Sequence, residues 1–100
     1  MAEIIWTEPA LLDLDEIAEY IAIENIIAAK KLVRSIFDKV DRLEQFPESG
    51  RIPPEIPHLN HREVVASPCR VFYKIADDNV YILFVMREER DLRKFLISKQ

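Results

Sequence analysis

The segment PESGRIPPEIPHLN, residues 47–60, is the feature that most constrains the fold of this chain. It contains four prolines and the only glycine of the sequence. Proline lacks a backbone N–H and clashes with the preceding helical turn, so neither a continuous helix nor a central strand can run through these residues. Ile52, Ile56 and Leu59 are expected to fix the segment to the core as an ordered loop. The loop therefore separates two halves of different pattern.

The half before the loop has the apolar periodicity of helices. A short strand is expected at residues 2–6, AEIIW, and Thr7 is expected to cap the helix that follows. Asn25 is a good cap for a second helix, which should end at Phe46 because a residue before proline is pushed out of the α region. So short a connection predicts an antiparallel helical hairpin. The apolar positions that recur at spacings of three and four are Ala10, Leu14, Ile17, Ala18, Ile21, Ala29, Val33, Ile36, Phe37, Val40 and Leu43.

The half after the loop has the pattern of strands. The runs REVVAS, RVFYKIA and VYILFVMR are separated by Pro68 and by Asp77-Asp78-Asn79, which is typical of a hairpin turn. They predict a three-stranded antiparallel meander, with the last strand, residues 80–86, central because it is apolar on both faces. The tail ERDLRKFLISKQ predicts a short C-terminal helix. The order β-α-α-β-β-β predicts one α+β domain over residues 1–100, an antiparallel sheet packed against an N-terminal helical hairpin.

Charge is distributed unevenly along the chain. The net charge is −4 with a pI near 5.2, which argues against nucleic-acid binding through a broad basic surface. Residues 1–60 hold 12 acidic and 6 basic side chains, whereas residues 61–100 hold 6 acidic and 8 basic ones. An anionic partner is therefore expected to meet the second half of the chain.

Cysteine use and hydropathy bear on the compartment. The lone Cys69 excludes an internal disulfide and any CxxC metal site, and its apolar strand predicts a small buried hydrophobe. No apolar run approaches the roughly 20 residues that cross a bilayer, and the N-terminus shows no signal pattern. We expect a cytoplasmic protein that has no membrane partner.

Five segments in this order carry a resemblance to a known family. They are IIWTEPALLDLDEIAEYIAIEN, AAKKLVRSI, LEQFPESGRIPPE, REVVASPCRVFYKI and VYILFVMREERDL. Together they resemble the ParE/RelE toxin superfamily of type II toxin–antitoxin modules, in its ParE branch, over about residues 3–92. The resemblance implies a toxin neutralised by a ParD-like ribbon-helix-helix antitoxin, with operator DNA bound only through the antitoxin. For ParE members it implies inhibition of DNA gyrase by stabilising the complex with cleaved DNA.

The RelE and YoeB branches of the superfamily imply an alternative, a ribosome-dependent mRNA endonuclease. Such chemistry needs a base, cations for the phosphate and an acid for the leaving oxygen. Glu63 could be the base, Arg70 could hold the phosphate, and Arg87 or Arg90 could complete the clamp. Those branches place a Tyr or His near the chain end, and after Arg87 this sequence has neither. No catalytic residue is therefore expected.

The same side chains also have structural interpretations. Glu63 is expected to form an ion pair or face water at a strand end. Arg70 resembles the arginine of the family's YR-x-x-Y strand signature, but Cys69 replaces the aromatic residue before it. The last strand ends in MREER where relatives have an HGxR-like motif, which leaves an inactive copy possible. The candidates for target binding are the cations of the tail, Arg87, Arg90, Arg93 and Lys94.

Other side chains give no indication of a cofactor. His58 and His61 stand three apart in a proline-rich loop with no obvious third ligand, so solvated histidines are expected and no metal site. Trp6 and Phe46 are expected in the core. There is no glycine-rich phosphate loop. The sequence therefore predicts no metal and no cofactor.

Overall fold

The computed structural model describes residues 1–99 and has the α+β architecture expected. None of the helices in this part of the chain is long and apolar enough to cross a membrane. A single 3₁₀ turn extends the second helix. The elements are β1 (Ile4–Trp6), α1 (Glu8–Ala22), α2 (Ile26–Asp41), the 3₁₀ turn (Arg42–Glu44), β2 (Arg62–Ala66), β3 (Cys69–Ala76), β4 (Asn79–Arg87) and α3 (Leu92–Ser98).

The four strands form one sheet in the order β1-β4-β3-β2. Strands β2, β3 and β4 make the expected antiparallel meander. Strand β1 instead runs parallel to β4, with Ile4 opposite Val80 and Trp6 opposite Ile82. The sheet is therefore mixed. The connection from β1 to β4 runs through the helical hairpin, the long loop, β2 and β3, which is ample for a parallel pair. This placement makes β4 an inner strand.

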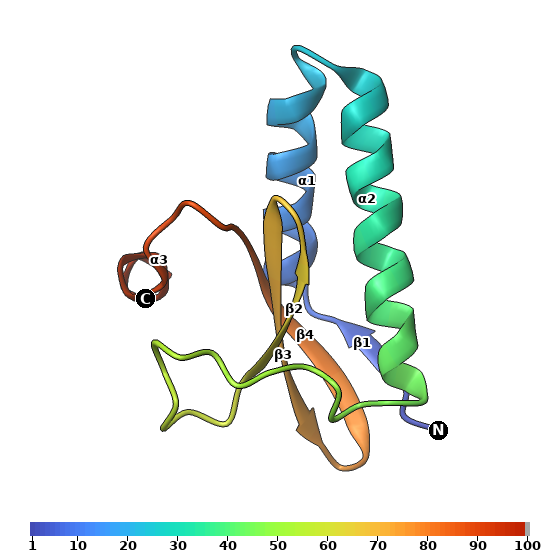
Figure 1. Ribbon diagram of the computed structural model, residues 1–100, viewed down its shortest axis with the longest axis vertical. Coiled ribbons are helices and arrows are strands. Elements are labelled where there is room, and N and C mark those ends of the chain that lie inside the picture. The colour runs from blue at the N-terminus through green and yellow to red at the C-terminus, as the bar shows by residue number, and fades with distance from the viewer. Residues whose placement is uncertain (100) are drawn as a thin grey trace.

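The helical hairpin is capped as expected at both starts. The Thr7 hydroxyl and the Asn25 side-chain oxygen each accept a backbone N–H from the first turn of the helix that follows. The two helices then lie side by side and antiparallel (Figure 1). Helix α2 ends at Asp41, so the expected end at Phe46 was too late. The chain tightens there into the 3₁₀ turn, a common way to finish a helix.

The sheet is covered on both faces. The hairpin packs on one face around a buried cluster that includes Ile36, Val71 and Ile82. On the other face, α3 and the loop before β2 cover Phe72 and Met86. The strands lie between the hairpin and α3 in Figure 1. The prediction that the last strand is covered on both sides is confirmed, since Val85 belongs to the first cluster and Met86 to the second.

Three apolar residues around the long loop do not join the core. Phe46, Ile52 and Leu59 are 62%, 52% and 39% exposed, against the expectation that they would be buried. Ile56 is the one of the expected loop anchors that is buried. The loop needs fewer apolar anchors because polar contacts from the strands also hold it. Trp6 packs on Phe37 with the ring centroids 4.9 Å apart, as expected for a residue at the core.

Candidate functional site

Arg70 lies at the centre of a cluster of charged side chains on the sheet face that carries α3. Its Nε donates to Glu63 Oε1 at 2.6 Å and its Nη2 to Glu63 Oε2 at 3.0 Å. Its Nη1 and Nη2 donate to the two carboxylate oxygens of Glu55 at 2.7 and 2.9 Å. Arg51 Nε completes the cluster by donating to Glu63 Oε2 at 2.8 Å. One guanidinium therefore holds two carboxylates, one from β2 and one from the proline-rich loop.

The cluster is buried to different depths. Glu63 is 1% exposed and Arg70 is 7% exposed, whereas the Glu55 and Arg51 side chains reach solvent. The hydrogen bonds from Arg70 lower the pKa of Glu55 to about 2, although partial burial opposes the shift. The bonds to Glu55 and Glu63 in turn raise the pKa of Arg70 above its usual range. Both shifts favour the charged forms of Glu55 and Arg70 at neutral pH.

The structure corrects the expectation for Glu63. An ion pair was expected, but at a solvated strand end, where such a pair contributes only about 0–1 kcal/mol. The carboxylate is instead enclosed, because Arg51 forms a bridge to the outer edge of β2 and covers it. Both oxygens of Glu63 accept hydrogen bonds from guanidinium groups, and three nitrogens of Arg70 are engaged. Glu63 therefore has a structural role, since guanidinium groups engage both of its oxygens and the side chain is only 1% exposed.

Arg87 points to the opposite face of the sheet from Arg70. In the β3–β4 register Arg87 is opposite Cys69, and Arg70 is opposite Met86. Because neighbouring side chains of a strand alternate between faces, the two arginines cannot meet on one substrate phosphate. Arg87 lies over the ring of Tyr20, with its Cζ 5.1 Å from the ring centroid.

The other tail cations have separate surroundings. Arg90 precedes α3 and lies over the ring of Phe95, 5.2 Å from its centroid. Arg93 donates to the backbone oxygen of Glu55 at 3.2 Å, and Lys94 is exposed. Since α3 begins at Leu92, Arg90 lies outside the helix and does not share a helical face with Lys94.

A groove beside the tail brings some of these cations near the charged cluster. It has a volume of about 420 Å³, and its positive side chains are opposed by an equal number of acidic ones. Its charge is therefore balanced and does not favour an anionic ligand by itself. The charged residues that line it are Glu55, Arg70, Glu88, Arg90, Asp91 and Arg93.

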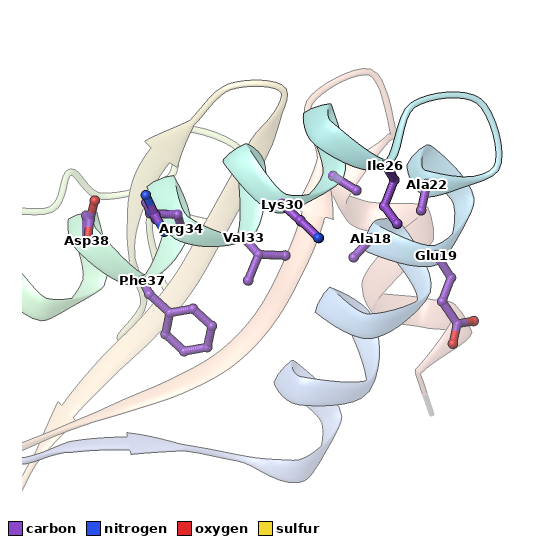
Figure 2. Close-up of a pocket in the computed structure, with 10 residues that line it drawn as sticks. Ala18, Glu19, Ala22, Ile26, Lys30, Val33, Arg34, Phe37 and Asp38 are labelled. Carbon is purple, nitrogen blue, oxygen red and sulfur yellow. The ribbon is translucent and has the colours of Figure 1, made fainter.

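An apolar groove lies between α1 and α2, as Figure 2 shows. It has a volume of about 520 Å³, and small side chains such as Ala18 and Ala22 leave room for Val33 and Phe37 to form its floor. The sequence signal for this groove was the set of large apolar residues of the hairpin that lie outside its periodic apolar positions. They include Tyr20, Ile23, Ile26 and Ile27, which are 64%, 82%, 59% and 64% exposed.

Asp13 is a buried acidic residue outside the Arg70 cluster. It lies among the acidic residues of α1 but is only 7% exposed. Its Oδ2 accepts the N–H of Val85 at 3.2 Å, and its Oδ1 pairs with Lys99 after α3. The signal in the sequence was its position within the apolar spacing of α1, three residues after Ala10 and four before Ile17. The pair connects α1 to the end of the chain.

No three histidine, cysteine, aspartate or glutamate side chains within residues 1–99 come together as a metal site. His58 is exposed, and His61 is half-buried next to a shallow pocket. Burial and the nearby Lys74 lower the pKa of His61, which favours its neutral form. Neither histidine faces a second ligand within that part of the chain.

Comparisons with known proteins agree with this architecture. A solved structure described as the chromosomal ParDE TA system from P. aeruginosa superposes with a TM-score of 0.74 and 27% identity, covering 89% of this chain and 98% of that one. Toxin RelE2 of Caulobacter vibrioides is 33% identical over 91 residues, which is 90% of this chain and 99% of the relative. The family described as "ParE toxin of type II toxin-antitoxin system, parDE" matches residues 4–92. The chain therefore belongs to the ParE toxin family of the ParE/RelE superfamily.

Proposed function

We propose that this toxin inhibits DNA gyrase by stabilising the complex of gyrase with cleaved DNA, and that a ParD-like antitoxin neutralises it. The observation that carries the proposal is the enclosure of Arg70 and Glu63 in their own ion-pair cluster. The alternative, a ribosome-dependent mRNA endonuclease, would need these side chains to face a substrate.

Two further features weigh against the endonuclease. Arg87 lies on the other face of the sheet from Arg70, so Glu63, Arg70 and Arg87 do not surround one phosphate. A general acid must also lie within hydrogen-bond reach of the leaving oxygen. The sequence after Arg87 offers no Tyr or His for that role. A protein that acts by binding another protein needs none of these groups.

The antitoxin partner is proposed from the family and from the apolar groove of the hairpin. The solved structure from P. aeruginosa is described as a ParDE TA system. An amphipathic helix that folds on binding could bury its apolar side chains in a groove of about 520 Å³ lined by alanines, Val33 and Phe37. With a net charge of −4, the toxin itself is a poor DNA-binding protein, so operator DNA would be reached through the antitoxin.

The test is a cleavage assay with purified gyrase, ATP and supercoiled plasmid. The proposal expects linear plasmid to appear in proportion to the added toxin, after protein is removed by protease and detergent. Ribosome profiling after induction in cells should show no new codon-linked cuts. Cuts that Arg70→Ala abolishes, without any linear plasmid in the gyrase assay, would establish the endonuclease instead.

Co-expression with the product of the adjacent reading frame tests the partner separately. The two proteins should elute together in size-exclusion chromatography, and the complex should give no linear plasmid. Separate elution at micromolar concentration would exclude neutralisation by that product.

A further inference from the structure

The apolar groove of the helical hairpin has two rims of opposite charge. Glu19 borders it on the α1 side, and the exposed Asp15 lies one turn earlier on the same side of α1. Lys30 and Arg34 border it on the α2 side, while Asp38 of α2 lies at the end away from the hairpin turn (Figure 2). Among residues 1–99 none of these side chains takes part in an ion pair. Their charges can therefore meet a partner that covers the groove.

The two helices also differ in the size of the apolar side chains that they bring to the groove. Helix α1 contributes Ala18 and Ala22, whereas the large side chains of the lining, Ile26, Val33 and Phe37, all come from α2. Ile26 is still 59% exposed although it lines this groove. A surface that fits the groove would therefore present large side chains over α1 and small ones over α2.

We propose that the groove binds the same groove of a second copy of this chain, related by a two-fold axis that runs along the helices. Such an axis places α1 of each copy over α2 of the other and keeps every residue at its level along the helices. The two hairpins then form a bundle of four helices with a self-complementary interface. A two-fold axis across the helices would instead place α1 over α1 and α2 over α2.

The axis along the helices matches both the sizes and the charges of the facing side chains. Ala22 ends α1 and Ile26 begins α2, so the two are level, and the alanine of one copy comes opposite the isoleucine of the other. Large side chains packed against small ones fill the space between helices. Glu19 and Lys30 each lie about one turn further from the hairpin turn, so the carboxylate of one copy meets the ammonium of the other. Each contact occurs twice in the dimer.

Other occupants of the groove are distinguished by their chemistry. The antitoxin helix proposed for this groove would compete with the second copy, so self-association would cover the apolar side chains of the toxin only until the antitoxin binds. A membrane surface fits less well, because anionic lipid headgroups would repel the acidic α1 rim. Neither gyrase as the target nor the antitoxin as a partner is needed for the dimer to form.

The first test is sedimentation equilibrium of the purified full-length toxin at micromolar concentrations, where monomer and dimer should interconvert reversibly. Ile26→Glu should raise the dissociation constant of the dimer roughly tenfold or more. The reason is that an apolar contact is lost in both halves of the interface and a carboxylate is placed opposite the acidic α1 rim. Ile27→Glu is the matched control, since Ile27 is 64% exposed but does not line the groove, and it should leave the dimer unchanged. Both variants should fold, because an acid in the first turn of a helix is favourable.

An exchange of charges tests the orientation of the two copies. Glu19→Lys and Lys30→Glu, both at exposed positions, should each raise the dissociation constant roughly tenfold, since each creates a like-charge contact twice in the dimer. An equimolar mixture of the two variants should form a mixed dimer about as stable as that of the wild type. One copy then carries two cations and the other two carboxylates at these positions, so both contacts are attractive.

Several outcomes would overturn the proposal. These are a monomer at every concentration up to the millimolar range, a dimer that Ile27→Glu weakens as much as Ile26→Glu does, and a dimer that neither charge reversal weakens. A dimer that becomes stronger when Glu19→Lys is mixed with the wild type would place α1 over α1. A monomeric toxin whose co-elution with the product of the adjacent reading frame is lost in Ile26→Glu would assign the groove to the antitoxin alone. Sedimentation of a monomeric toxin with anionic lipid vesicles, lost in the same variant, would assign it to a membrane.

Discussion

The hydroxyl of Tyr73 lies against the backbone of Gly50 and ties the proline-rich loop to the centre of the sheet. It accepts the Gly50 N–H at 2.9 Å and donates to the carbonyl of Pro47 at 2.7 Å. Tyr73 is fully buried, and that burial raises the pKa of its hydroxyl. The approach leaves no space for a side chain at position 50, since an added Cβ would lie 2.7 Å from the backbone oxygen of Glu63.

Gly50→Ala should therefore destabilise the fold. The added methyl group would meet both the Tyr73 ring and the β2 backbone, and overpacking of this kind typically costs about 1–3 kcal/mol. Urea unfolding followed by circular dichroism would measure the loss. Ser49→Ala is the control, because Ser49 is exposed and should change the free energy of unfolding little. An unchanged midpoint for Gly50→Ala would mean that the loop moves away from Tyr73 at little cost.

Replacing Arg70 should destabilise the protein more than an ordinary surface arginine. Arg70→Gln leaves the buried Glu63 with Arg51 alone, and removing one partner of a buried pair typically costs about 3–5 kcal/mol. The double variant Arg70→Gln with Glu63→Gln should recover much of this loss, since no buried charge is left unpaired. Equal losses in the single and double variants would show that the cluster stabilises through packing instead of charge.

The same cluster predicts how stability changes in acid. The folded pKa of Glu55 is about 2, below its usual value of 4.5, so its contribution to stability is fully present above that usual value. The contribution is lost as the pH falls from about 4.5 towards 2. Glu55→Gln should flatten the decline of the unfolding midpoint in that range. Glu24→Gln, at an exposed position of the hairpin turn, should not.

Local chemistry made much of the fold predictable. Thr7 and Asn25 cap the helices because a side-chain oxygen satisfies a nearby N–H, which depends on adjacent residues alone. The hairpin turn follows the same logic, as Asp77 and Asp78 adopt positive φ values of 53° and 64°. Aspartate and asparagine tolerate this region better than most residues. Such signals are short-range and can be found in a single sequence.

The features that were missed depend on contacts between distant residues. Strand β1 was predicted, but its parallel pairing with β4 joins segments that are separated by the helical hairpin, the loop, β2 and β3. Glu55 gave no signal in a proline-rich loop, and only the fold brings it to Arg70. The pattern of Phe46 beside a helix end suggested burial, yet the early end of α2 turns it to solvent. The apolar pattern of a sequence does not indicate such contacts between distant residues.

Cys69 should be almost unreactive in the folded protein. It is fully buried, and that burial raises the pKa of its thiol to about 11 although Arg87 opposes the shift. The reactive thiolate is then scarce at neutral pH. Reaction with a disulfide reagent should be slow in buffer and fast in urea. Rapid labelling of the folded toxin would show that the end of the β2–β3 hairpin opens readily.

The last prediction concerns the tail cations and the proposed gyrase complex. Arg90 lies in the turn before α3, and the exposed Lys94 follows in the helix, so both side chains can reach a partner although they do not share a helical face. If the tail meets gyrase or DNA phosphate, Arg90→Glu with Lys94→Glu should abolish toxin-dependent linear plasmid. The thermal midpoint should change little, because exposed charges contribute about 0–1 kcal/mol.

The control for that variant is Lys31→Glu with Lys74→Glu, which changes the net charge equally at exposed positions on α2 and β3. This control variant should yield as much linear plasmid as the wild type does. That result would separate a local contact from a general effect of charge. If the tail variant still yields linear plasmid at the wild-type dose, the tail cations do not contact the target. The contact surface would then be sought on the helical hairpin, where Ile23 and Ile27 are exposed and no packing requirement of the fold explains them.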